Sequence, residues 1–179
     1  MTQFEIQALS QHWLLPDDSD GDLCSHGTIR LIIGEQTIVD GEEEYGLSTS
    51  ALALLRTLER DHTHSAPVAD RLLMHGCGLI LMRGCPIGVN WSVVHSRGRV
   101  ALANVERFET TAAAPTRRYA VDITIPFEKY RQQVLSFAQQ VRTFFDDSRP
   151  RVLPDKFDQE QFHDFWSEYL QILKRSEAA

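Results

Sequence analysis

The change from strand to helix at Pro126 constrains the fold of this chain more than any other sequence feature. Before Pro126, apolar side chains alternate strictly with other residues, which places them on one face of a strand: Tyr119, Val121, Ile123 and Ile125. Proline is favoured in the first turn of a helix. The residues that follow form an apolar stripe at helical spacing: Phe127, Tyr130, Val134, Phe137, Val141 and Phe144. The sequence therefore predicts a strand that leads directly into a long amphipathic helix.

Strand-like patterns precede this junction along most of the chain. They cover residues 4–15, 28–33, 37–39, 72–82, 89–95, 100–105 and the strand that starts at 118. Short connections that contain Gly34 and Gly98 predict two hairpins. Hairpins join antiparallel strands, so the patterns predict an antiparallel sheet of about six to seven strands.

Two further helices are predicted, one on each side of the later strands. The first begins near Ser48 or Ser50, both good N-caps, and the last begins at Asp155 or Asp158. Early strands, one inserted helix and two C-terminal helices indicate an α+β fold with its helices packed on one face of the sheet. A chain of 179 residues with 42% apolar and 24% charged residues is typical of one globular domain, so residues 1–179 are expected to form a single domain.

The charge balance restricts the class of partner. With 25 acidic and 18 basic residues the formal net charge is -7, which disfavours nucleic acid and favours a basic protein. The most apolar stretch, residues 72–82, is too short to span a bilayer, so no membrane partner is expected. The N-terminus has no secretory pattern, and three cysteines are read as free thiols. We therefore expect a cytoplasmic protein.

Two acidic segments are interpreted as solvated turns at opposite ends of one three-strand region. Their carboxylates are Asp17, Asp18, Asp20, Asp22, Glu42, Glu43 and Glu44. The first segment is not an EF-hand, because aligning Gly21 with the invariant glycine places Pro16 and Gly27 where carboxylates are required. If both turns project from one side, they form a negative patch that speeds association with a basic protein.

Cysteines and histidines suggest a second kind of site. On a strand, residues two apart point the same way, so Cys24-x-His26 and His75-x-Cys77 could each present two zinc ligands, with Cys85 as a fifth donor. Zinc is thus the possible cofactor, although the two-residue spacing of common zinc sites is absent and no cofactor is expected otherwise. The same residues also fit a thiol enzyme, or small buried side chains without chemistry.

Other motifs receive structural interpretations. The sequence Gly46-Leu47-Ser48-Thr49-Ser50 lacks the last glycine of a nucleophile elbow, so Ser48 is interpreted as a helix cap. His62 and His64 are expected to be solvated or to cap helix carbonyls. An aromatic stripe in the last helix is interpreted as core, with a homodimer interface as the alternative: Phe162, Phe165, Trp166, Tyr169 and Leu173.

The cysteine and histidine motifs also carry a resemblance. Cys24-Ser25-His26-Gly27, the helix after Leu47-Ser48, His75-Gly76-Cys77-Gly78 and the run from Cys85 to Trp91 resemble a bacterial family of uncharacterised proteins over about residues 1–105. That family has no established activity, so the resemblance implies no catalytic residue. In size and charge the chain is also similar to the small acidic immunity proteins that accompany bacterial toxins.

Three functional hypotheses follow. The leading one is a non-enzymatic protein-binding module, of the immunity type, that neutralises a partner toxin through the acidic segments. The second is a zinc-dependent or thiol enzyme, or a structural zinc protein, that uses the cysteines and histidines. The third is a homodimeric scaffold that pairs through the aromatic stripe.

Overall fold

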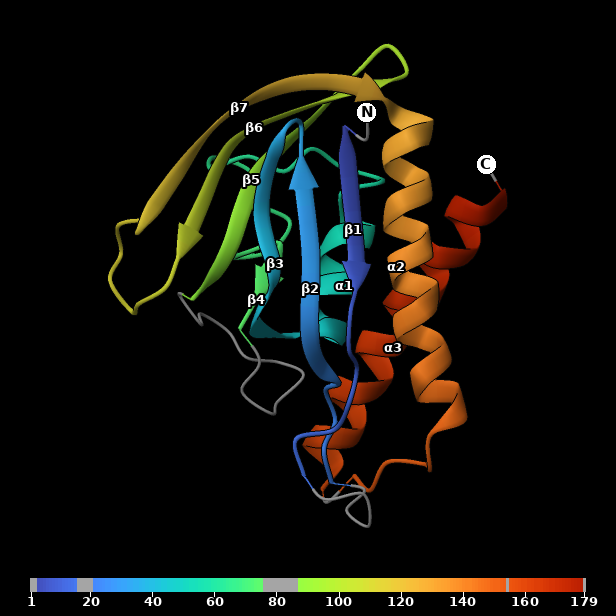
Figure 1. The fold of residues 1–179 in the computed structure, drawn as a ribbon. Coiled ribbons are helices and arrows are strands. Elements are labelled where there is room, and N and C mark those ends of the chain that lie inside the picture. The colour runs from blue at the N-terminus through green and yellow to red at the C-terminus, as the bar shows by residue number, and fades with distance from the viewer. Residues whose placement is uncertain (1–2, 16–20, 76–86, 154, 179) are drawn as a thin grey trace.

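The computed structural model describes residues 3–15, 21–75, 87–153 and 155–178, and the described chain has an α+β fold, as predicted (Figure 1). The strands are β1 (Phe4–Ala8), β2 (His26–Ile33), β3 (Gln36–Gly46), β4 (Leu73–Met74), β5 (Gly88–Ser96), β6 (Arg99–Phe108) and β7 (Arg117–Pro126). The helices are α1 (Leu47–Arg56), α2 (Phe127–Asp147) and α3 (Lys156–Ala178). No described helix combines the length and the apolar character that crossing a membrane would need.

The described strands form two antiparallel sheets in place of the single predicted sheet. One has the order β1-β2-β3, and the other has the order β4-β5-β6-β7. Both predicted hairpins are present, with Gly34 and Gly98 at positive φ in their turns. Hairpin signals identify neighbouring strands, but they do not show whether two hairpins share one ladder, and this is why the prediction merged the sheets.

The junction at Pro126 is confirmed. Strand β7 alternates between more buried and more exposed residues and ends at Pro126, and α2 starts at Phe127. The stripe of α2 buries Tyr130, Val134 and Phe137 against the rest of the core. In Figure 1, α2 runs beside β1 and α1 lies behind the three-stranded sheet; α3 packs against both helices.

The predicted helix starts are partly confirmed. Helix α3 begins at Lys156, and the Asp155 carboxylate accepts a hydrogen bond from the Asp158 N–H at 2.9 Å, as an N-terminal cap does. Helix α1, however, begins at Leu47, and its N-cap residue Gly46 makes no side-chain capping bond. Ser48 is therefore not the cap, and its buried hydroxyl instead donates to Cys24 Sγ at 3.0 Å.

Candidate functional site

The acidic segment 40–44 is part of β3 and is not the turn that the sequence predicts. Thr28 and Arg30 of β2, two residues apart, pair with Glu44 and Asp40 of β3, four residues apart, so β3 bulges between them. Gly41 supplies the left-handed backbone of this bulge, with φ at +86°. Because a bulge interrupts the alternation of side chains, consecutive residues of β3 can reach the same group on the neighbouring sheet.

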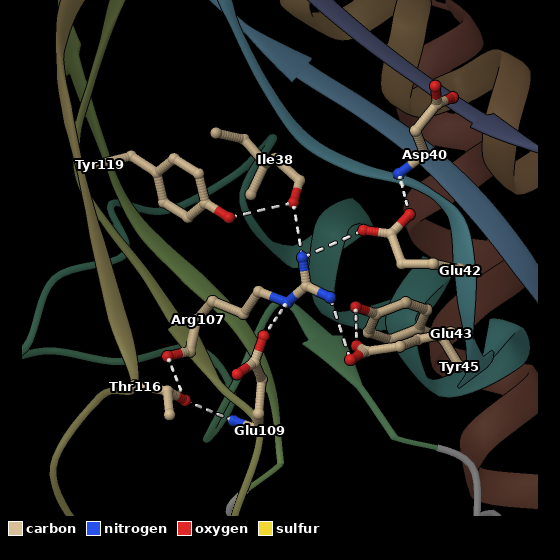
Figure 2. Close-up of polar contacts among 9 residues, drawn as sticks. All are labelled: Ile38, Asp40, Glu42, Glu43, Tyr45, Arg107, Glu109, Thr116 and Tyr119. Carbon is tan, nitrogen blue, oxygen red and sulfur yellow. Dashed lines mark hydrogen bonds and ion pairs between the residues drawn. The ribbon is translucent and has the colours of Figure 1, made fainter.

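That group is Arg107 of β6, which three carboxylates surround (Figure 2). Its guanidinium lies 3.1 Å from Glu42, 2.9 Å from Glu43 and 3.2 Å from Glu109. The Arg107 side chain is only 8% exposed, whereas those of Glu42, Glu43 and Glu109 are 48%, 36% and 43% exposed. The cation is thus hidden behind the carboxylates that solvent meets.

Side-chain bonds around Arg107 connect the two sheets. The Ile38 carbonyl of β3 accepts hydrogen bonds from Arg107 and from the Tyr119 hydroxyl of β7, each at 3.2 Å (Figure 2). The Tyr45 hydroxyl donates to Glu43 at 3.0 Å and helps to fix that carboxylate. No ladder pairs β3 with β6 or β7 among the described strands, so these side chains form a polar bridge between the sheets.

Electrostatics keep several groups of this cluster in one charge state. Burial lowers the pKa of Arg107, but the bond and charge of Glu43 outweigh it and raise the pKa above its ordinary value. Burial raises the pKa of Glu42, but backbone N–H groups and Arg107 together lower this pKa by more, so the net shift is downward. Burial and the nearby Glu43 charge raise the pKa of Tyr45. The arrangement therefore suits a fixed charge surface better than proton transfer.

The other predicted acidic residues are placed differently. Glu44 is half exposed and its carboxylate lies 3.3 Å from His12 Nε2. Asp22 is 3% exposed, so it does not belong to a surface patch; its carboxylate accepts hydrogen bonds from the N–H groups of Leu14 and Cys24. The Cys24 bond is buried and the Leu14 bond is partly buried, and such backbone donors need an acceptor, which explains why Asp22 faces inward. Asp17, Asp18 and Asp20 lie outside the described residues.

The sequence interpretation missed Arg107 and Glu109. Val100 and Leu102 define the buried face of β6, and an unbroken alternation would place Arg107 on the exposed face. Asn104, with φ at +53°, interrupts the alternation, so Val105 and Arg107 are buried instead. A charged residue at the end of an apolar strand was the only signal, and it carries no information about partners on another sheet.

Cys24 and His26 are both buried, and the Cys24 thiol is not activated. Cys24 is 2% exposed, and burial raises the pKa of its thiol although the Ser48 hydroxyl donates to the sulfur. His26 is 1% exposed with Nδ1 3.9 Å from Asp22, and burial lowers its pKa despite that charge. A thiol catalyst needs the opposite shift, towards thiolate. Cys24 is better explained as a structural residue.

The zinc hypothesis stays a prediction. His75 forms a backbone bridge with Tyr45, whereas Cys77 and Cys85 lie outside the described residues. Within residues 3–15, 21–75, 87–153 and 155–178, no group of three or more His, Cys, Asp or Glu could hold a metal ion.

His62 is a core residue and is neither solvated nor a carbonyl cap. It is fully buried, and its Nδ1 accepts a hydrogen bond from the Val68 N–H at 3.0 Å. Nε2 must then carry the proton, and it donates to Asn90 Oδ1 at 2.9 Å. Burial lowers the pKa of His62, so the neutral ring is part of the fold.

We expect His62 to make the protein sensitive to mild acid. Because its pKa is lower in the folded state, the unfolded chain binds more protons once pH falls below about 6.5, and stability falls with pH until the folded pKa is passed. One such histidine contributes a slope of up to about 1.4 kcal/mol per pH unit. Urea unfolding of the wild type and of His62→Gln between pH 7.5 and 5.5 tests this. A smaller slope is expected in the variant, with a remainder from His26; equal slopes would show that His62 is not responsible.

In comparisons with known proteins, no protein-family model, curated protein or solved structure matches the chain.

Proposed function

We propose that this chain is a non-enzymatic protein-binding module of the immunity type, which acts in the cytoplasm and occludes a basic partner protein. The observation that carries the proposal is the arrangement of three partly exposed carboxylates around one buried arginine, which leaves two net negative charges at one place. We use the name acidic surface for Glu42, Glu43, Glu44 and Glu109. Its residues come from β3 and from the position directly after β6.

Preorganisation makes this surface suited to recognition. Arg107 and Tyr45 hold Glu42 and Glu43 in fixed orientations before any partner arrives. Ordering a flexible side chain at an interface costs roughly 0.5–1.5 kcal/mol, and a preformed surface avoids part of that cost. A lysine or arginine of the partner would meet carboxylate oxygens that are already aligned, because the competing cation Arg107 lies behind them.

Charge complementarity of this kind acts mainly on the association rate. Oppositely charged surfaces steer encounter, and salt screens the effect. Inhibition of a toxin requires fast and specific capture, so a rigid negative surface on a compact acidic chain fits this role. The absence of an activated thiol at Cys24 also favours binding over catalysis at the one described cysteine.

Neutralising Glu44 and Glu109 of the acidic surface should slow binding to the partner. The partner would be isolated by affinity capture on the wild-type chain from cells that produce it, then purified. We expect the double variant Glu44→Gln/Glu109→Gln to associate at least about tenfold more slowly at low salt, with a weaker dependence of the rate on salt. Stopped-flow measurement of the association rate over a salt series gives both quantities.

A control variant distinguishes the effect of charge at the acidic surface on the association rate from the effect of the net charge of the chain. Glu35→Gln/Glu160→Gln removes the same amount of charge from exposed positions on the β2–β3 turn and on α3. It should change the association rate less than twofold. Equal slowing by both double variants, or the failure to capture any stoichiometric partner, would contradict the proposed function. Loss of the partner's own activity on binding would identify the immunity type specifically.

A further inference from the structure

A cleft of about 630 Å³ is lined by residues from the C-terminal part of the chain, none of which belongs to the strands that form the acidic surface. The end of α2, the segment 148–153 and α3 form its walls. Its volume is in the range of clefts that take small organic molecules. The residues that matter for its chemistry are Arg142, Arg149, Arg151, Phe162, Trp166 and Leu170.

The cleft has an aromatic wall that the core holds in place. Trp166 is 6% exposed, and its ring packs edge-on against Phe145 at a centroid distance of 4.4 Å and against Phe162 at 6.2 Å. Trp13 also packs edge-on against Phe145, at a centroid distance of 4.9 Å. Such an interlocked cluster forms an apolar wall whose side chains do not have to be ordered by a ligand.

Arginines without acidic partners accompany this wall. Arg149 is exposed and forms no ion pair with a described carboxylate. Arg151 stacks on Trp13 at 4.0 Å and donates from Nε and Nη2 to the Arg149 carbonyl. Its Nη1 is buried and has no hydrogen-bond partner. Only Arg142, which lies over Trp166 at 4.9 Å, has a carboxylate partner, Asp146.

Two guanidinium groups without a described carboxylate partner therefore lie beside one cleft, in a chain of net charge -7. The surroundings also expose apolar side chains, with Val152 at 50%, Phe157 at 65% and Leu170 at 42%. A buried donor without a partner is unfavourable, and a bound acceptor that reaches Arg151 Nη1 would satisfy it.

We propose that this cleft is a binding site for a small organic anion with a flat apolar body. The body packs on Trp166 and Phe162, and a carboxylate, sulfonate or phosphate group binds Arg149 and Arg151, whose planar guanidinium groups suit such oxyanions. Leu170 closes the apolar side. The site is built from α2, α3 and the segment between them, so it is independent of the acidic surface and of the proposed function.

Two matched dyes test the proposal on the full chain. 8-Anilinonaphthalene-1-sulfonate carries one anionic group on an aromatic body, and N-phenyl-1-naphthylamine has the same body without the charge. We expect saturable binding of one sulfonate dye per chain, with an affinity at least about tenfold above that of the neutral dye. Fluorescence titration measures both, and the stoichiometry excludes diffuse binding to apolar surface.

Variants locate the site. Arg149→Gln/Arg151→Gln should weaken the sulfonate dye at least about tenfold and leave the neutral dye within twofold, which also shows that the cleft is intact. Arg117→Gln is the matched control, because Arg117 is an exposed arginine that stacks on Tyr119 outside the cleft. Equal loss of both dyes, no loss of the sulfonate dye, or equal loss in Arg117→Gln would each overturn the proposal. Glu44→Gln/Glu109→Gln should leave dye binding unchanged.

Discussion

Replacement of Arg107 by methionine is expected to lower the free energy of unfolding by about 3 kcal/mol, the lower end of what breaking a buried ion pair costs. The variant leaves Glu42, Glu43 and Glu109 close together without their cation. The lower end applies because these carboxylates are partly exposed and keep water, and because Tyr119 still donates to the Ile38 carbonyl. Equilibrium unfolding in urea at neutral pH measures the change.

A surface ion pair provides the control for this prediction. Arg118 lies next to Arg117 on β7 and bonds Glu106 at 3.0 Å, but its side chain is 72% exposed. Arg118→Gln should therefore change stability by less than about 1 kcal/mol. Similar losses in Arg107→Met and Arg118→Gln would contradict the assignment of Arg107 as the polar bridge between the sheets.

The effect of Arg107→Met should also depend on pH. The pKa of Glu42 is depressed in the folded protein, so its contribution to stability is present above its unfolded pKa of about 4.3 and is lost as pH falls through the folded pKa. Without Arg107 the part of this contribution that Arg107 supplies is lost, although the backbone N–H bonds to Glu42 remain, and protonation relieves the repulsion among the glutamates. The stability difference between wild type and variant should therefore shrink from pH 7 to pH 3.

Gly27→Ala is the second substitution with a large expected effect. A Cβ atom at this position would lie 2.0 Å from the Ser10 carbonyl oxygen and 3.0 Å from Leu47 Cδ1. The chain after β1 continues alongside β2 so closely here that the Leu9 N–H donates to the Thr28 carbonyl at 2.8 Å. Backbone would have to move, so we expect a loss of about 3 kcal/mol, the upper end of typical overpacking. Thermal and urea unfolding test this.

Gly98→Ala serves as the comparison. Nothing lies within 4 Å of a Cβ at Gly98, and only its φ of +74° disfavours alanine. The loss should be about 1 kcal/mol. If Gly27→Ala costs no more than Gly98→Ala, close approach of the backbone does not explain why glycine follows His26.

Local periodicity predicted those elements that each carry a complete pattern. The alternation before Pro126 and the stripe after it define β7 and α2, and glycines at Gly34 and Gly98 mark both long hairpins. Neither prediction required knowledge of a distant contact, because the pattern reflects which face each segment buries.

The candidate site could not be predicted in the same way. Acidic residues and glycine are depleted in strands, so residues 40–44 favoured a turn, whereas a bulge at Gly41 keeps them in β3. Their partner Arg107 is distant in sequence and belongs to another sheet. Asp22 was expected on the surface and is buried. Its burial depends on two backbone donors that no side-chain pattern reveals.

The polar bridge at Arg107 has a consequence for the behaviour of β3 in a crowded solution. Among the described residues, β3 pairs with β2 along one edge, and its other edge forms no ladder beyond the single bridge between Tyr45 and His75. Unpaired backbone groups on that edge are therefore open to a chain that could add a strand. Arg107 and Tyr119 occupy the Ile38 carbonyl on that edge, and the glutamates place like charges along it. Two copies of the chain that approached each other along this edge of β3 would therefore repel each other. The same residues that we propose for recognition thereby protect the molecule against edge-to-edge aggregation.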